Sequence, residues 1–326
     1  MTPPVTPRAV GSRADFDVVP APVRTWLEET LGARVESAAT QIGGMSPGPA
    51  ARLLLDTGDR AFVKAVGTSL NAFTPRLFRR EVEILRQLPG VDYRPAMLAS
   101  YDDGEWVAIV LEDVDGRHPD LDDPADLAAA RTVVRRQTTE LTPNPVATDE
   151  PDLTATARRW SDEIHAASSE SRALLPPWWR DHEAELLGRI TSLEEQVPSE
   201  CLCHLDIRDD NLLVRRDGSA VVFDWGMARP GPTWVDEVLL DLHVVHRASF
   251  DDRVEELPSY VGGTQTGEQR SAAVTDFVLT LAVSLALLAQ GDSHGLPHLT
   301  EFRRRESERL LVGAERRLGL AGSSSL

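Results

Sequence analysis

The sequence has 326 residues, of which 41% are hydrophobic and 26% are charged, as is ordinary for a soluble globular protein. This length allows one large domain or two modest domains. The 52 acidic residues outnumber the 34 basic residues and give a net charge of −18. Because like charges repel, this balance argues against binding to nucleic acid or to an anionic membrane surface.

Targeting and membrane signals are not evident in the sequence. Residues 1–22 are rich in proline and contain no apolar run of the kind found in signal peptides. The apolar stretch 272–289 contains Asp276, so we expect a buried helix and not a membrane span. Cys201 and Cys203 are too close in sequence for a usual disulfide. We interpret them as small apolar residues of a strand, although a metal site with His204 is the alternative. Together these features predict a cytoplasmic protein.

The negative charge is concentrated in the second part of the chain. Up to Leu111 there are 12 basic and 13 acidic residues, whereas from Glu112 onward there are 22 basic and 39 acidic residues. An acidic surface attracts cationic ligands. This distribution therefore favours a cationic small-molecule partner, and simple solubility explains it equally well.

The first part of the chain reads as a small sheet with two helices. We expect residues 1–14 to be disordered. A short helix around Trp26 ends at Gly32, and a second helix follows the third strand. The predicted helices span 18–31 and 75–88, and the predicted strands span 35–42, 51–55, 61–66, 93–100 and 106–111.

A glycine-rich turn, residues 43–48, connects the first two predicted strands. Glycines at such a turn allow backbone N–H groups to approach phosphate oxygens. This signal is weak when taken alone, because most turns of this composition are only turns.

Lys64 is the only lysine of the chain, against 33 arginines. It lies in the third predicted strand and alternates with Phe62 and Val66, so it points toward an otherwise apolar face. A lysine on a buried face needs a partner. Arginine serves everywhere else, which suggests that this position requires a compact ammonium group.

From Pro124 onward the chain reads as mainly helical. A turn at residues 229–236 leads into a helix that ends near His246. We expect residues 251–269 to form a mobile acidic loop and residues 320–326 to fray. The other predicted helices span 125–141, 153–165, 178–197, 272–289 and 300–317.

A hairpin inside this helical part carries the chemistry. Two apolar runs, 212–214 and 221–223, are separated by the turn signal Asp217-Gly218. A hairpin would bring Asn211 and Asp224 to one end, where their oxygens suit Mg²⁺. Asp206, on the preceding loop, would then accept a proton from an attacking hydroxyl. This layout is typical of phosphoryl transfer.

These motifs resemble a known family. His204-x-Asp206-x4-Asn211 followed by Asp224-Trp225-Gly226 is similar to the catalytic loop and metal motif of the aminoglycoside phosphotransferase and choline kinase family, within the protein-kinase-like superfamily. The resemblance implies an α+β, two-lobed protein-kinase-like fold. It implies a small antiparallel-sheet lobe at 1–111 that binds nucleotide, a hinge at 112–117 and a larger, mainly helical lobe at 118–326.

The resemblance also implies a nucleotide site. Lys64 would hold the phosphates, and Glu81 on the following helix would orient it; Glu83 is the competing candidate. The glycine-rich turn is similar to the family's Gly-Gly-x-Ser turn, so Gly44 and Ser46 would face the phosphates.

The segment 111–116 resembles the family's hinge. Its backbone at Glu112 and Val114 would bind the adenine edge of ATP, and the sequence leaves GTP possible. Asn211 and Asp224 would hold Mg²⁺, and Asp206 would be the catalytic base.

The catalytic loop departs from the family pattern at two places. Leu205 stands where many members have glycine, and Arg208 begins a segment that differs from the family's His-Pro-Gly-Asn. Arg208 either contacts the γ-phosphate or forms a surface pair with Asp209 or Asp210. An acid such as Asp236, at the start of the next helix, braces this loop in the family.

The sequence therefore predicts a small-molecule kinase that phosphorylates a hydroxyl of a cationic compound, such as an aminoglycoside-like antibiotic or an amino alcohol. The alternatives are a nucleotide-binding module without turnover and a kinase of a nucleoside or sugar metabolite. A protein kinase is disfavoured, because only about ten residues separate Asp224 from the next predicted helix. A monomer is slightly favoured over an oligomer.

Overall fold

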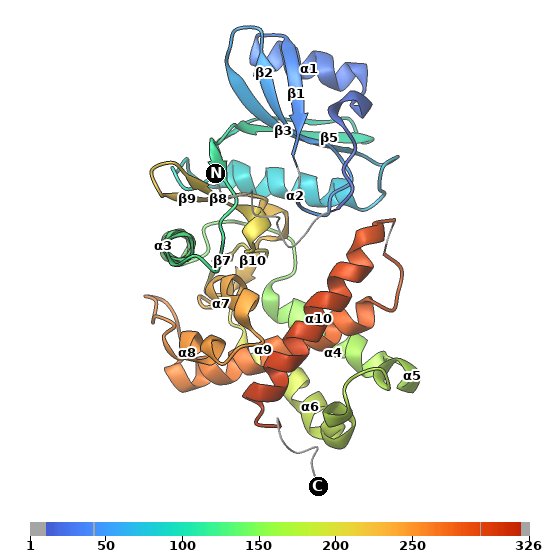
Figure 1. Cartoon of the computed structure of the whole chain (residues 1–326), viewed down its shortest axis with the longest axis vertical. Coiled ribbons are helices and arrows are strands. Elements are labelled where there is room, and N and C mark those ends of the chain that lie inside the picture. Colours follow the sequence, from blue (N-terminus) through green and yellow to red (C-terminus); the bar gives the residue numbers. More distant parts are fainter. Residues whose placement is uncertain (1–10, 42, 294, 321–326) are drawn as a thin grey trace. The chain divides into compact units, whose positions relative to one another are not determined.

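The computed structural model describes residues 11–41, 43–293 and 295–320 (Figure 1). The chain forms two compact units, and each is assembled from separate stretches of sequence. Unit 1 takes its residues from 1–134, 206–228 and 294–298, and unit 2 takes its residues from 135–205, 229–293 and 299–326. The predicted hairpin that carries Asn211 and Asp224 thus belongs to the same unit as the N-terminal sheet, and so does the predicted hinge. The predicted lobe boundaries stay a prediction.

A five-stranded antiparallel sheet organises unit 1. Its spatial order is β1-β2-β3-β5-β4, so the three N-terminal strands form a meander and β5 inserts between β3 and β4. Each strand agrees with a predicted one, although β4 begins later than expected. The strands are β1 (Val35–Thr40), β2 (Ala50–Leu55), β3 (Arg60–Gly67), β4 (Met97–Asp102) and β5 (Trp106–Glu112).

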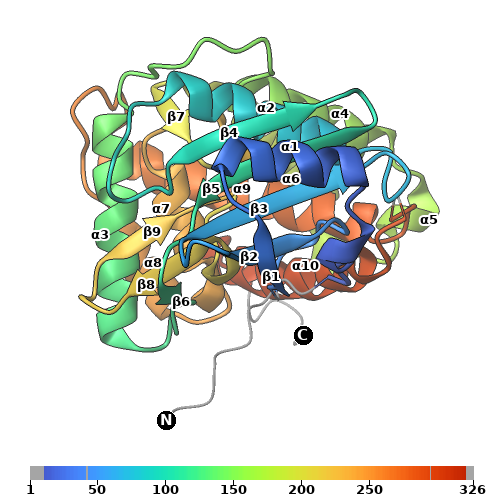
Figure 2. The same cartoon turned by 90° about the horizontal axis from the view of Figure 1, so that it is seen from above.

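Two helices cover opposite faces of this sheet (Figures 1 and 2). Helix α1 (Ala21–Leu31) packs Val23 and Leu27 into one core with strand residues such as Val63. It ends at Gly32, whose φ of 67° lies in the left-handed region that glycine adopts without strain. Helix α2 (Thr74–Gln87) covers the other face. Because successive side chains of a strand alternate between faces, Lys64 points to the α2 side when Val63 points to α1.

The predicted hairpin is present in unit 1. Strands β8 (Leu212–Arg215) and β9 (Ala220–Val222) pair antiparallel with Leu212 opposite Val222. Gly218 supplies the positive φ of 82° that the tight turn requires. This register places Asn211 and Asp224 next to the same end of the ribbon, as predicted. A short strand, β6 (Gly116–Arg117), extends the ribbon on its other edge.

Unit 2 is a set of helices around one apolar core. Trp179, Trp234 and Phe277 are among its fully or almost fully buried side chains. Helix α3 (Pro124–Glu140) begins in unit 1 and ends in unit 2. The other helices are α4 (Leu153–Ala166), α5 (Ser169–Arg172), α6 (Pro177–Gln196), α7 (Val235–Asp241), α8 (Ser249–Glu255), α9 (Gly267–Leu288) and α10 (Pro297–Arg317).

Two predictions for this region need comment. The segment 251–269 is not a continuous loop, because its beginning belongs to α8 and its end to α9, which starts with a capping box at Thr266. Helix α9 is long and apolar enough to cross a membrane, but 61% of its most apolar window is buried inside the structure. Its Asp276 pairs with Arg189 at 2.8 Å, as expected for a helix in a protein core. The predicted frayed end, 320–326, lies almost wholly outside the described residues.

Candidate active site

The sole lysine lies at the centre of a buried ion cluster. Lys64 Nζ is 2.6 Å from Glu81 Oε2 and 2.9 Å from Asp224 Oδ1, and the Lys64 side chain is only 6% exposed. Burial acts to lower the pKa of Lys64, but the charges of Asp224 and Glu81 outweigh it and raise the pKa. The competing candidate, Glu83, is exposed on the same helix. The predicted Lys64–Glu81 ion pair is therefore confirmed.

Helix α2 is also attached directly to the metal motif. Glu81 Oε1 accepts a hydrogen bond from the backbone N–H of Trp225 at 3.3 Å. The neighbouring Arg80 donates to the carbonyl oxygens of Met227 and Ala228. Arg80 and Glu81, both buried on α2, thus fix the turn that follows Asp224. Asp224 itself has a φ of 69°, a left-handed conformation that is uncommon for any residue but glycine.

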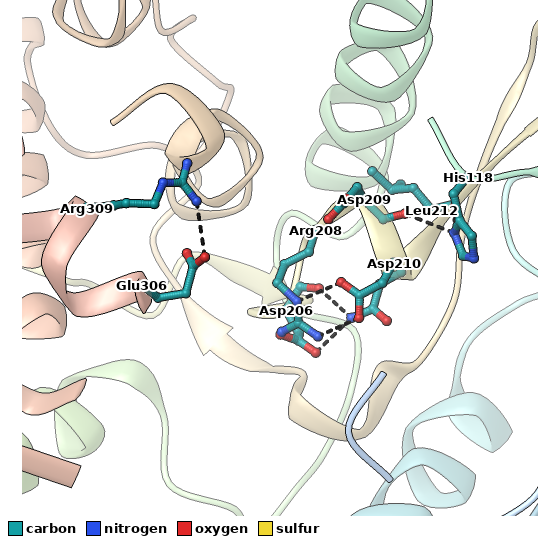
Figure 3. A network of polar contacts seen from close by, with 9 residues as sticks. His118, Asp206, Arg208, Asp209, Asp210, Leu212, Glu306 and Arg309 are labelled. Carbon is teal, nitrogen blue, oxygen red and sulfur yellow. Dashed lines mark hydrogen bonds and ion pairs between the residues drawn. The ribbon is translucent and has the colours of Figure 1, made fainter. Parts of the chain in front are cut away.

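The loop before β8 folds around Asp206. The Nδ2 group of Asn211 donates to the carbonyl oxygen of Asp206 at 2.8 Å and to its Oδ2 at 2.7 Å. Arg208 donates to the Asp206 carboxylate. It also forms a bidentate ion pair with Asp210, in which Nε and Nη2 donate to the two carboxylate oxygens at 2.8 and 2.9 Å. Figure 3 shows the Arg208 side chain between these two acids. Of the two alternatives for Arg208, the pairing with Asp210 is present, but it is not a surface pair, because the Asp210 side chain is 0% exposed and that of Arg208 is 19% exposed. A contact with the γ-phosphate stays a prediction.

Burial and charge set the ionisation of this loop. Burial raises the pKa of the Asp206 carboxyl to about 7, although the Arg208 guanidinium acts in the opposite direction. Burial acts to lower the pKa of Arg208, but Asp206 and Asp210 outweigh it and raise the pKa. His118 holds the loop from outside, with Nδ1 3.1 Å from the carbonyl oxygen of Asp209 and 3.0 Å from that of Leu212 (Figure 3).

A pocket in unit 1 is lined by residues of both clusters, although Asp206 and Arg208 are not among its lining residues. Its empty volume of about 730 Å³ includes space that is open to solvent. One wall carries charge from Lys64, Asp210 and Asp224, together with the Asn211 amide. The remaining lining consists of Arg13, Gln41, Gly43, Gly44, Ala50, Arg52, Phe62, Pro95, Leu111, Glu112, Asp113, Val114, His118, Leu213 and Phe223.

Two residues of the predicted hinge lie in the pocket lining, and their contact with adenine stays a prediction. Glu112 and Val114 both contribute to this lining. Between them, the side chain of Asp113 is only 4% exposed and pairs with Arg52 at 3.3 Å and Arg60 at 2.8 Å. Arg52 also donates to the carbonyl oxygen of Val114 at 2.8 Å, so β2 fixes the hinge backbone.

The glycine-rich turn contributes to the pocket only in part. Gly43 and Gly44 line it, with φ values of 106° and 73° that favour glycine. Ser46 is not among the lining residues. Its Oγ is buried and has no hydrogen-bond partner within the described part of the chain. A contact of Ser46 with phosphate stays a prediction.

The residues suit a magnesium ion shared with phosphate. Asn211 uses its amide N–H groups on Asp206, and within the described residues no hydrogen bond reaches its Oδ1. A carbonyl oxygen and the Asp224 carboxylate on one pocket wall are hard oxygen donors, and Mg²⁺ typically takes only one or two carboxylates from the protein. In keeping with this, the described residues contain no group of three or more His, Cys, Asp or Glu side chains that could hold a metal by themselves.

The cysteine pair is a structural feature of unit 2. Cys201 and Cys203 lie on β7 (Cys201–Cys203), fully buried and free, with their Sγ atoms 3.4 Å apart. Burial raises the pKa of the Cys203 thiol, which keeps it protonated. The interpretation as buried strand residues is confirmed.

A buried acid in unit 2 holds the backbone that leads into the catalytic loop. Asp236 on α7 accepts hydrogen bonds from the backbone N–H groups of His204 at 2.7 Å and Leu205 at 2.9 Å. Gln137 donates to the same carboxylate at 3.0 Å. Leu205 has a φ of 59°, the left-handed conformation that the family's glycine would adopt without strain.

Comparison with known proteins identifies the family. Residues 51–272, more than half of the chain, match the model of the phosphotransferase enzyme family. The chain belongs to the phosphotransferase enzyme family. No match to a curated protein sequence was found. This phosphotransferase uses ATP as donor and an alcohol group as acceptor.

Solved structures support the kinase-like fold. Choline kinase LicA from Streptococcus pneumoniae superposes with a TM-score of 0.58 at 14% identity, over 89% of this chain and 99% of that one. A thermostable mutant of aminoglycoside phosphotransferase APH(4)-Ia gives a TM-score of 0.55 at 14% identity, over 92% and 100%. The AMP-bound spectinomycin phosphotransferase APH(9)-Ia gives 0.52 at 13% identity, over 89% and 93%. At these identities the likeness concerns the fold.

The sequence missed several residues of the site. Arg13 falls in the segment expected to be disordered, yet residues 11–14 are described, and Arg13 lines the pocket. His118 and the Arg52–Asp113 pair show no motif or periodicity that would single them out. These residues line the pocket only because segments that are distant in the sequence become neighbours in the fold.

Proposed function

We propose that this phosphotransferase transfers the γ-phosphate of ATP to a hydroxyl of a cationic small molecule, such as an aminoglycoside-like antibiotic or an amino alcohol. The observation that carries the proposal is the arrangement of Lys64, Asn211 and Asp224 on one pocket wall, with Asp206 hydrogen-bonded to Asn211. A cation, two oxygen ligands and an acid are the groups that phosphoryl transfer requires.

Each group has one task in this proposal. Lys64, oriented by Glu81, binds donor phosphate oxygens, and the backbone at Glu112 and Val114 binds the adenine edge. Asn211 and Asp224 hold Mg²⁺, which neutralises charge on the phosphoryl group when it is bound. Asp206 accepts the proton of the acceptor hydroxyl.

The choice of a cationic acceptor is supported by charge. The residues from Glu112 onward carry an excess of 17 negative charges, and an acidic surface raises the local concentration of cations. The matching structures include a choline kinase and an aminoglycoside phosphotransferase, and choline and aminoglycosides are cationic compounds. The same acidity disfavours nucleic acid and anionic membranes as partners.

The test is a product screen. Purified protein is incubated with Mg²⁺ and ATP or GTP, together with a panel of aminoglycosides, amino alcohols, nucleosides and sugars. Mass spectrometry then identifies any acceptor that gains one phosphoryl group. Transfer to an amino compound is expected. Transfer to a neutral sugar or nucleoside would contradict the charge argument, and tight nucleotide binding without transfer to any compound would favour a binding module.

A further inference from the structure

The segment before α1 lies along the glycine-rich turn of unit 1. The backbone N–H of Gly11 donates to the carbonyl oxygen of Gly44 at 2.8 Å, and that of Ala14 donates to Pro47 at 2.9 Å. Between them, the Nε group of Arg13 donates to the carbonyl oxygen of Gly43 at 2.7 Å. These contacts hold the segment against the turn, so Arg13 has a defined place in the fold.

The guanidinium of Arg13 reaches into the nucleotide pocket. It lines the same pocket as Lys64, Asn211 and Asp224. Its Nη2 atom would lie 2.5 Å from a Cβ atom at position 44, so a larger residue there would displace the guanidinium from its present place. The φ of 73° at Gly44 already favours glycine at this position.

Arg13 differs from the other lysine and arginine side chains of the pocket lining. Lys64 pairs with Glu81 and Asp224, and Arg52 pairs with Asp113. Within the described residues, Arg13 has no carboxylate at ion-pair distance. Its hydrogen bonds within the described residues use Nε and Nη1, the latter to Gly48 at 3.4 Å, and Nη2 has none there.

The surroundings of Arg13 call for an anion. Burial lowers the pKa of its guanidinium, and the more distant acids Asp224 and Asp210 offset this effect only in part. Taking a charge out of water without a close partner is costly. A guanidinium presents donors in a plane that matches two oxygens of a phosphate. A phosphate chain beside Lys64 would supply the missing partner.

We propose that Arg13 binds the phosphate chain of the donor nucleotide, as a second cation supplied by the segment that precedes the first helix. This inference rests on the proposed function, because it places a phosphate chain in the pocket. Nε and Nη1 anchor the side chain to the glycine-rich turn, and Nη2 contacts phosphate oxygen.

The competing explanation is a purely structural one, in which Arg13 only clamps the glycine-rich turn. A clamp affects all ligands of the pocket equally, because it shapes the cavity. An arginine that binds phosphate instead raises the affinity of each ligand according to the number of phosphate groups within reach of its guanidinium. A ligand series with a constant base and sugar therefore separates the two roles.

The experiment measures binding of adenosine, ADP and ATP by calorimetry in the presence of Mg²⁺, for wild type, Arg13→Gln and Arg13→Lys. Arg24→Gln is the matched control, because Arg24 is exposed on α1 and its loss changes the net charge equally. Loss of a hydrogen bond to a charged group should weaken ATP binding roughly tenfold to a hundredfold. Adenosine binding should change by less than about twofold in all variants, which also shows that the pocket is folded. Arg13→Lys should retain part of the affinity for ATP.

Three outcomes would overturn the inference. Equal weakening of adenosine, ADP and ATP in Arg13→Gln would show a clamp, and unchanged affinities would show that Arg13 does not contact the ligand. Loss of affinity in Arg24→Gln of the same size would reduce the effect to net charge. Absence of any nucleotide binding by the wild type is a different result, since it would contradict the proposed function as well.

Discussion

Two ion clusters in unit 1 have the same charge arrangement, but one joins residues distant in the sequence and the other joins near neighbours. In each, one cation lies between two acids: Lys64 between Glu81 and Asp224, and Arg208 between Asp206 and Asp210. The first combines side chains from β3, α2 and the end of the hairpin. The second is contained within five consecutive residues.

The two clusters therefore depend differently on the tertiary structure. The Lys64 cluster forms only when the sheet, α2 and the hairpin have all folded and packed, so its integrity reports on the tertiary structure. The Arg208 cluster can form within its own loop. We therefore expect changes in the Lys64 cluster to alter nucleotide binding and the packing of α2, and changes at Asp206 to alter the chemical step.

The largest expected effect comes from the local cluster. Asp206→Asn should lower turnover by roughly 10²- to 10⁴-fold, because the proton acceptor is removed, while binding of Mg-ATP is kept. In the Lys64 cluster, Asp224→Asn should instead abolish the dependence of nucleotide binding on Mg²⁺. Titration with ATP, with and without Mg²⁺, and single-turnover assays distinguish the two.

Asp217→Asn is the control for these variants, since Asp217 lies exposed at the opposite end of the same hairpin. It should behave as wild type. If Asp206→Asn and Asp224→Asn lost nucleotide binding to the same extent, the division of roles between the two acids would be wrong.

The long-range cluster is tested by keeping its charge and changing its shape. Lys64→Arg should lower turnover by about a hundredfold, because a guanidinium fits poorly between two acids that hold a compact ammonium and misplacement by about 1 Å can cost that much. The assay is steady-state turnover with saturating ATP. Near-normal turnover would show that any cation suffices at this position.

A smaller effect is expected on α2. Glu81→Gln keeps the shape of the side chain but removes one of the two charges that orient Lys64, and should lower turnover by about tenfold, near the cost of one weakened charged hydrogen bond. Glu83→Gln, two residues away and exposed, should leave turnover unchanged. Equal effects of the two substitutions would point to the total charge of the helix and not to the pair.

The smallest expected effect concerns the residue before the local cluster. Leu205→Gly should be more stable than Leu205→Ala by roughly 1 kcal/mol, because the left-handed φ of 59° strains every residue except glycine. At Leu98, an exposed residue on β4, alanine should be the more stable substitution. Chemical unfolding of the four variants gives the comparison. A preference for alanine at both positions would mean that the loop adopts another conformation.

Most elements and the central motifs could be predicted from the sequence, because they depend on local pattern. Apolar alternation located the strands, and the Asp217-Gly218 turn fixed the hairpin that carries Asn211 and Asp224. The sole lysine indicated its own site, and the Arg80-Glu81 pair indicated the correct partner. These signals lie within segments of about twenty residues or fewer.

The rest depends on contacts that no local pattern records. Arg13 follows a proline-rich segment that resembles a disordered leader, and its place is set by backbone bonds to a turn about thirty residues later. The acidic segment 251–269 was expected to be a loop because charge dominates it, whereas Phe250 and Val254 bury one side of α8. Short strands such as β7, with three residues, are defined by their partners.

Because the only lysine of the chain is buried, a lysine-specific protease can be used to measure the opening of the sheet of unit 1. A protease specific for lysine can cut this chain at one bond only, between Lys64 and Ala65, and both residues are buried in the middle of β3. Cleavage into fragments 1–64 and 65–326 therefore requires β3 to leave its place between β2 and β5. The rate of this single cut reports the opening of the sheet of unit 1, without any label or engineered site. A ligand that binds only when β3 is in place should slow the cut in proportion to its occupancy.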